Sequence, residues 1–246
     1  MTKRKSKSSR ATDVERLRDD ILAAAWRHVS FDGWTAKAFA AAARDAGAGP
    51  TGLARAFPGG PKDAVRHLGR WLDRRMTESL GRQLRRKPMR THERVAAAAK
   101  VRLGVLAPHR EAVRRLVAFL ALPRNAGLAS KLLWRAADAI WRAAGDTSTD
   151  FNYYTKRGLL AGVYGSTLLF WLTDASEDRA ATDAFLDRRI ADVMKIFSVR
   201  ARLKSAGEGL AFAKRVGERL ARFVPHGFAG RFGRGSSSPR RPPHRD

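Results

Sequence analysis

The sequence predicts an all-α protein, a bundle of about nine or ten helices, because apolar residues recur every three or four positions and no stretch alternates as a strand would. The chain has 246 residues, of which 44% are hydrophobic, enough to form a substantial core. Capping and turn residues separate the periodic segments. Helices that pack without a sheet form a bundle.

The first part of the chain reads as three helices with a sharp turn, followed by a longer helix. Apolar residues from Ile21 to Val29 repeat at helical spacing, and "DGWT" then breaks the pattern. Thr35 is a good N-cap for a short helix over 36–45. A turn containing a brief helix follows, and 62–83 is the longer helix. The first three helices are typical of a helix-turn-helix region.

The rest of the chain predicts six more helices. The expected ranges are 93–106, a helix opened by Pro108, 128–144, 150–172, 180–202 and 203–224. Gly145 fits the position after a helix end, and Ser176 fits a cap. Residues 225–246 are rich in Gly, Arg, Ser and Pro, so we expect a disordered tail.

The net charge of +26 is the most distinctive feature of the composition. Cations are concentrated in an N-terminal arm and in the C-terminal tail, but the body between them is basic too. Such a field attracts nucleic acid or an anionic membrane surface, and charge alone does not separate the two. Solubility in an arginine-rich protein is the simpler alternative.

Motifs for catalysis or metal binding are weak. The chain has no cysteine, which excludes disulfides, thiolate metal sites and a cysteine nucleophile. No histidine has a second ligand at metal spacing on its own helix. Asp183 and Asp187 share a helix face, but Arg188 and Arg189 adjoin them, which favours a solvated, salt-bridged face over acid–base chemistry. We therefore expect no enzymatic activity.

Neither a secretory signal nor a spanning helix is expected. The basic N-terminus runs into an amphipathic segment, and the longest apolar run, 158–173, is shorter than the roughly 20 residues of a transmembrane helix. These observations predict a soluble body.

The segment 146–172 combines a polar start with an apolar end. Lys156 and Arg157 lie in the early turns of the expected helix, where the helix dipole disfavours cations. Either Asp146 or Asp150 compensates them, or Arg157 holds an anion such as a phosphate headgroup. Three glycines, Gly158, Gly162 and Gly165, leave room beside the helix for a neighbouring helix or for a long apolar molecule. Together with one face of this helix, which runs from a polar start to an apolar end, they suit an amphipathic lipid. The face comprises Tyr154, Arg157, Ala161, Tyr164, Leu168 and Trp171.

The last expected helix, 203–224, has an apolar stripe and a basic polar face. The stripe includes Leu210, Val216, Leu220 and Phe223, and the basic face includes Lys214 and Arg215. This pattern is typical of a helix that lies in a membrane interface. Packing against the body or against a dimer mate is the alternative.

The N-terminal stretch from "ILAAAWRHVSFDGWTAKAF" to "FPGGPKDAV" resembles the DNA-binding head of the TetR repressor family. In that family the third helix reads bases in the major groove. Here it reads "PTGLARAF", in which Arg55 is the only long polar side chain. Direct readout depends on Arg, Lys, Asn or Gln, so the scaffold is present without a reading surface.

Two later stretches, "IWRAAGDTSTDFNYYTKRGLLAGVY" and "FLDRRIADVMKI", resemble the ninth coenzyme Q (ubiquinone) biosynthesis protein family. The resemblance runs from about Arg18 to Val224 and implies a dimeric, TetR-type, lipid-binding accessory of the di-iron demethoxyubiquinone hydroxylase. It implies that Arg157 contacts lipid. It also implies that the surface around Asn152, Tyr153, Tyr154 and Lys156 docks the hydroxylase. The family usually has Trp at Tyr153 and an acidic residue near Leu168 and Leu169.

These observations predict five segments and one main function. The segments are a basic disordered arm (1–12), a helix-turn-helix-like region (13–60), a helical lipid-binding body (61–202), an amphipathic membrane helix (203–224) and a disordered tail (225–246). We expect a homodimer, without specific nucleic acid, that binds phospholipid or an isoprenoid quinone and presents a quinone intermediate to the hydroxylase. Its place would be the inner membrane surface, on the bacterial cytoplasmic or mitochondrial matrix side. A TetR-family regulator with a hydrophobic effector is the alternative.

Overall fold

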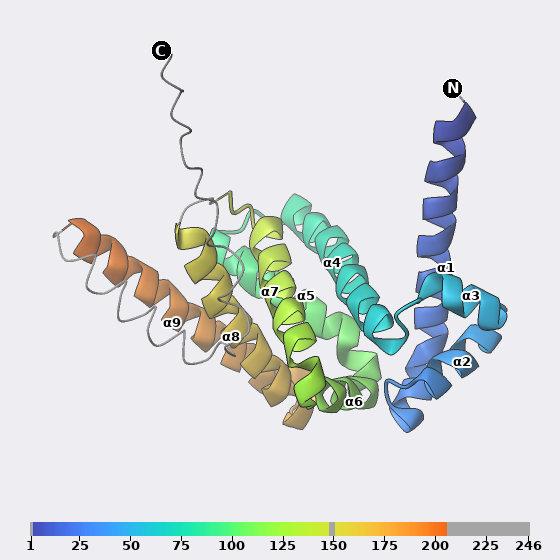
Figure 1. Ribbon diagram of the computed structural model, residues 1–246. Helices are drawn as coiled ribbons and strands as arrows, with labels where there is room; N and C mark the ends of the chain where they lie inside the picture. Colours follow the sequence, from blue (N-terminus) through green and yellow to red (C-terminus); the bar gives the residue numbers. More distant parts are fainter. Residues whose placement is uncertain (1, 148–150, 206–246) are drawn as a thin grey trace, which may run out of the picture. The chain divides into compact units, whose positions relative to one another are not determined.

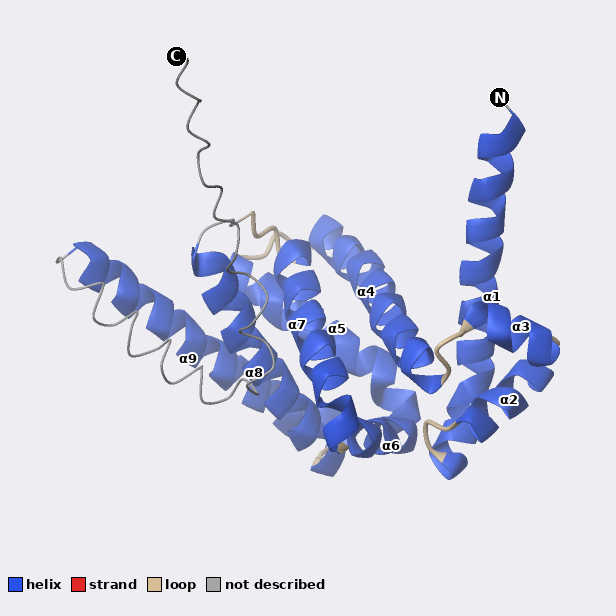
Figure 2. Cartoon of the chain, viewed as in Figure 1, coloured by secondary structure: helices blue, strands red, loops and turns tan. Residues whose placement is uncertain are grey.

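The computed structural model describes residues 2–147 and 151–205, and within them all regular structure is helical, joined by short loops (Figures 1 and 2). The α-helices of the described residues are α1 (Thr2–Asp32), α2 (Ala36–Asp45), α3 (Gly49–Ala56), α4 (Pro61–Arg86), α5 (Thr91–Leu106), α6 (Arg110–Ala121), α7 (Ala126–Ala143), α8 (Phe151–Thr173) and α9 (Ala180–Ser205). Short 3-10 turns precede α6, α7 and α9. The predicted all-α class is confirmed.

Helices α1 to α3 form a helix-turn-helix head around an aromatic core. Gly33 turns the chain after α1 with a φ of 68°, and the Thr35 hydroxyl accepts the Ala38 N–H at 3.2 Å, as expected of an N-cap. Trp34 and Phe39 pack with ring centroids 5.8 Å apart. The predicted helix-turn-helix geometry follows from these contacts.

The head is fastened to α6 and to the turn before it. The Trp34 indole N–H donates to the Ala112 carbonyl at 3.0 Å, and both residues are buried. Trp26 stacks on His109 with ring centroids 4.1 Å apart. Both contacts join residues that are more than 70 positions apart in the chain, so they are tertiary.

The body is built from α4 to α8 and the first turns of α9. Helix α4 packs against α5 and α7, and α7 packs against α8 (Figure 1). Asp73 of α4 joins three helices, because its carboxylate accepts Arg135 Nε of α7 at 2.8 Å and a guanidinium hydrogen bond from buried Arg102 of α5. Compact units comprise Met1–Met194 and Lys195–Asp246.

Several helix boundaries differ from the sequence prediction. Helix α1 begins at Thr2, so the arm expected to be disordered is helical in its described part, which contains no Gly or Pro to break it. Pro108 lies in a 3-10 turn, and α6 begins only at Arg110. Gly145 follows the end of α7 with a φ of 92°, as predicted.

No described helix is by itself long and apolar enough to cross a bilayer. The segments Thr91–Ala121 and Pro123–Ala143 reach the required length and composition only as a pair, which is bent by 97°.

Candidate functional site

The start of α8 is held by a buried network of ion pairs. The Arg157 side chain donates from Nε to Asp138 Oδ1 at 2.7 Å and from Nη1 to Asp146 Oδ2 at 3.1 Å. Lys156 Nζ donates to the other oxygen of Asp146 at 2.7 Å. Arg157 is only 1% exposed, and its guanidinium lies 3.5 Å from the centre of the Tyr153 ring. The network therefore ties α8 to α7 and to Asp146, in the loop after α7.

Opposing effects set the protonation of this network. Burial alone would raise the pKa of Asp138, but hydrogen bonds from Arg157 and Arg142 outweigh it and lower that pKa. Asp138 is therefore a carboxylate at neutral pH, as its two arginine partners require.

Asp146 compensates both cations at the start of α8, which is the first of the alternatives predicted from the sequence. Asp150 lies outside the described residues. Arg157 was expected to contact a lipid headgroup, but in this structure its nitrogens face two carboxylates instead of open space. A headgroup could reach it only after these ion pairs open.

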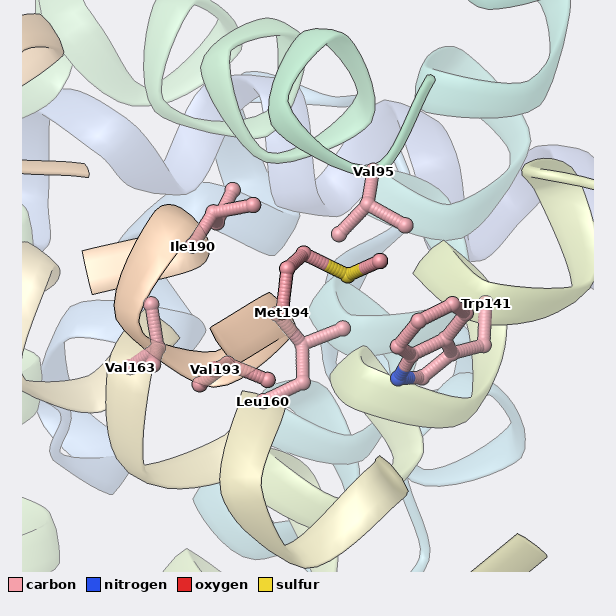
Figure 3. A pocket seen from close by; sticks show the side chains of 7 residues that line it. All are labelled: Val95, Trp141, Leu160, Val163, Ile190, Val193 and Met194. Carbon is pink, nitrogen blue, oxygen red and sulfur yellow. The ribbon is translucent and has the colours of Figure 1, made fainter. Parts of the chain in front are cut away.

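None of the six α8 residues predicted to bind lipid lines the apolar cavity of Figure 3. Tyr154 is 63% exposed, whereas Tyr164 and Trp171 are buried beneath arginines. Arg102 lies 5.6 Å from the Tyr164 ring centre, and Arg110 lies 5.4 Å from that of Trp171. Ala161 and Leu168 are half-buried. Three of these six side chains, those of Arg157, Tyr164 and Trp171, are already buried within the protein.

The glycines of α8 play different roles. A Cβ added at Gly165 would lie 3.4 Å from Leu133 of α7, so Gly165 marks a close approach of the two helices. A Cβ at Gly158 or Gly162 would meet nothing within 4 Å. Only one of the three glycines thus serves helix packing in the described residues.

An apolar cavity lies beside α8, on a face that the sequence did not single out (Figure 3). Its space is about 250 Å³, open solvent included. Side chains from four helices converge on it, with the Met194 thioether among them. The lining residues are Val95 of α5, Trp141 of α7, Leu160 and Val163 of α8, and Ile190, Val193 and Met194 of α9.

The cavity residues carried a signal in the sequence, but an ambiguous one. Leu160 with Val163, and Ile190 with Val193, repeat at three-residue spacing, which is typical of any buried helix face. Whether such a helix face is fully packed or borders a cavity depends on how the four helices pack together, which the sequence does not show.

An exposed aromatic surface adjoins the ion-pair network. We define the aromatic surface as Trp134, Tyr153 and Tyr154. The Tyr154 ring centre lies 6.1 Å from that of Trp134 and 5.1 Å from that of Tyr153. Trp134 and Tyr154 are both exposed, which is unusual for large aromatic side chains. The side chain of Asn152, the third expected docking residue, lies outside the described part.

The predicted membrane helix is not described by the structure. Leu210, Lys214, Arg215, Val216, Leu220 and Phe223 all lie within 206–246, outside the described residues, as does the predicted tail.

Comparison with known proteins gives consistent matches. Residues 126–197, which contain six of the seven cavity residues, match a family model described as COQ9. The chain is 35% identical over 205 residues to "Ubiquinone biosynthesis protein COQ9, mitochondrial" of Rattus norvegicus, covering 80% of this chain and 64% of the rat protein. It is 34% identical to the human protein of that name, covering 80% of this chain and 63% of the human protein. The chain therefore spans a little less than two thirds of these two relatives.

Two further matches bear on family and fold. The chain is 34% identical over 204 residues to "Ubiquinone biosynthesis protein COQ9-B, mitochondrial" of Xenopus laevis, covering 80% of this chain and 69% of that protein. The crystal structure of the TetR transcriptional regulator from Nitrosomonas europaea ATCC 19718 superposes with a TM-score of 0.56 at 18% identity. It covers 73% of this chain and 98% of the regulator, which confirms the predicted TetR-type fold.

Proposed function

The chain belongs to the COQ9 family, as its sequence predicted, and from this premise we propose that it is a lipid-binding accessory protein of ubiquinone biosynthesis. The printed names of its relatives support the pathway. We further propose that it is not an enzyme and that it works as a homodimer on the inner membrane surface. The names of the relatives support a mitochondrial location, where the proposed place is the matrix side, and the bacterial counterpart is the cytoplasmic side.

The observation that carries this proposal is the apolar cavity inside the segment that matches the family model. Its lining offers no charged side chain, so it suits a hydrocarbon tail and not a polar ligand. The bound molecule would be a phospholipid or an isoprenoid quinone, whose tail enters between α5, α7, α8 and α9.

The cavity must widen to accept such a tail. The space of about 250 Å³ includes open solvent, so the enclosed part of the cavity is far smaller than the roughly 300–1,000 Å³ that sites for small molecules usually hold. Met194 is the lining residue best able to give way, because its thioether chain has three rotatable bonds. Binding thus couples to a rearrangement of Met194.

We assign partner docking to the aromatic surface together with Asn152 and Lys156. Exposed aromatic rings are the side chains that most often dominate binding energy at protein interfaces. The proposed partner is the di-iron demethoxyubiquinone hydroxylase, to which the protein would present a quinone intermediate. The helix expected over 203–224 would hold the protein on the membrane.

Filling the cavity tests the lipid proposal. Val163→Trp adds bulk to the cavity lining, whereas Leu169→Trp introduces the same side chain at an exposed position of the same helix. We expect lipid extraction and mass spectrometry to recover lipid from the wild type and from Leu169→Trp, and much less from Val163→Trp. Thermal unfolding of all three checks that each is folded. Wild-type protein that repeatedly carries no lipid would refute the proposal.

A TetR-type transcription factor is the alternative that the fold allows. The exposed residues of α3 are Pro50, Thr51, Ala54 and Arg55, so its outer face still carries only one long polar side chain. A gel-shift titration in increasing salt separates the two functions. We expect steep loss of DNA binding with salt, as for backbone attraction alone. Sequence-selective binding that survives moderate salt would favour the regulator.

A further inference from the structure

A concentrated positive surface lies where α4 gives way to α5. We define the basic turn as Arg82, Arg85, Arg86, Lys87 and Arg90. All five side chains are exposed, and no acidic residue occurs between Glu78 and Glu93. Five cations within nine positions leave this turn with a strong local positive field.

The cations of the basic turn differ from several exposed cations elsewhere, which are paired with acids. Arg66 pairs with Asp63 at 2.5 Å, and Arg114 pairs with Glu111 at 2.6 Å. Within the described part of the chain, no ion pair involves a side chain of the basic turn. The charge of this surface is therefore available to an external anion.

The nearest acid does not neutralise the surface. Glu93 Oε2 accepts the backbone N–H of Arg90 at 2.7 Å. That hydrogen bond, followed by the positive charges of His92, Arg90 and Lys87, lowers the pKa of Glu93. A helix C-terminus favours cations such as Arg85 and Arg86 through its dipole. The dipole does not account for Lys87 and Arg90, which lie beyond the helix.

The position of the basic turn separates it from the helix-turn-helix head. The head adjoins the first residues of α4, and α4 has 26 residues, a length of about 39 Å. The basic turn lies at the far end (Figure 1). A duplex gripped by the head would therefore not use this surface.

The same turn lies near the apolar cavity. Arg94 Nε donates to the Met89 carbonyl of the turn at 2.9 Å, and Arg94 Nη1 lies 3.4 Å from the Cβ position of Gly145. Val95, the next residue, lines the cavity, as does Trp141 one turn before Gly145. Cations and an apolar space at one end of the bundle match the two parts of an anionic lipid.

We propose that the basic turn is a membrane-contact surface that binds the headgroups of anionic phospholipids, so that the cavity end of the bundle faces the bilayer. The choice of a membrane over another polyanion rests on the proposed function. The contact is separate from the expected helix at 203–224, and it fixes which end of the helical body meets the lipid.

Neutralising the turn tests this assignment in the full-length protein. The variant Arg85→Gln/Arg86→Gln/Lys87→Gln removes three exposed charges. Binding is measured by flotation with phosphatidylcholine vesicles, with and without phosphatidylglycerol. Each Lys or Arg near an anionic surface contributes about a fivefold gain, so we expect the partition coefficient on phosphatidylglycerol vesicles to fall roughly a hundredfold. The variant Arg85→Lys/Arg86→Lys should keep wild-type binding.

The matched control is Arg55→Gln/Arg124→Gln/Lys131→Gln, which removes equal charge from exposed positions away from the turn. We expect the control to bind anionic vesicles far better than the turn variant. An equal loss in both would show a net-charge effect and overturn the assignment. A turn variant that loses affinity for a DNA oligonucleotide but keeps vesicle binding would also overturn it, in favour of a nucleic-acid surface. Lipid extraction from the same proteins tests lipid binding in the cavity, and vesicle flotation tests the basic turn. A failure of the proposed lipid-binding function can therefore be told apart from a failure of the membrane-contact proposal.

Discussion

Replacing Arg157 with methionine should destabilise the protein by about 3 kcal/mol, because it removes a buried cation that satisfies two carboxylates. Breaking a buried ion pair usually costs roughly 3–5 kcal/mol. The lower end applies here, because Asp138 keeps Arg142 at 2.9 Å and Asp146 keeps Lys156 at 2.7 Å. For a chain of this size that loss corresponds to a melting temperature lower by roughly 6–12 °C.

Thermal and urea unfolding, followed by circular dichroism, measure this cost. Arg142→Met is the matched control, because it removes an exposed partner from the same aspartate. Exposed ion pairs contribute about 0–1 kcal/mol, so the control should change little. The difference between wild type and Arg157→Met should shrink as the pH falls below about 4. Folding lowers the pKa of Asp138. The stability that the Asp138 carboxylate contributes is therefore complete when the pH is above the pKa of the unfolded state, and it is lost as the carboxylate becomes protonated.

Equal stability of Arg157→Met and Arg142→Met would refute this reasoning. It would mean that the buried guanidinium stabilises nothing in the free protein. Arg157 would then serve to bind a ligand and not to stabilise the fold. The headgroup contact implied by the family resemblance would explain its burial better.

Three further outcomes are expected. Gly162→Ala should stabilise the protein by about 0.5–1 kcal/mol, since the added Cβ meets nothing within 4 Å; a lower melting temperature would contradict this. Burial lowers the pKa of His67 despite its hydrogen bond to Asp19, so wild type should lose stability as the pH falls below about 6.5. The urea midpoint of His67→Gln should depend less on pH than that of wild type, and an equal pH dependence in both proteins would count against this prediction. Tyr154→Ala should weaken hydroxylase binding roughly 30-fold in a calorimetric titration, whereas Phe31→Ala should not; equal effects would remove the aromatic surface from the interface.

Much of the fold could be predicted from the sequence because local signals decide it. Thr35 caps α2 through its own hydroxyl, and Gly145 supplies the positive φ that ends α7. Such signals act within a few residues, so a single chain displays them. The helix that Pro108 was expected to open begins two residues later, at Arg110, because a proline is equally compatible with a 3-10 turn.

The site was harder to predict, because it depends on contacts between helices. Arg157 meets Asp138 across 19 positions, and helical periodicity does not indicate which carboxylate on another helix will be near. Periodicity also groups residues on a face without saying whether that face is filled. Trp171 packs inside the body, whereas Leu160 borders a cavity. Tyr153 and Tyr154 were singled out only because the family resemblance drew attention to them, and Trp134, which packs against Tyr154, was not singled out.

The fastening of the head to α6 has a consequence for cooperativity. Trp34 and Trp26 of the head bury their rings against Ala112 and His109, so the head cannot unfold without exposing part of the body. Segments linked in this way open as a single cooperative unit, and their amide protons exchange through the same global event. The head is therefore a structural part of the core, whatever it binds.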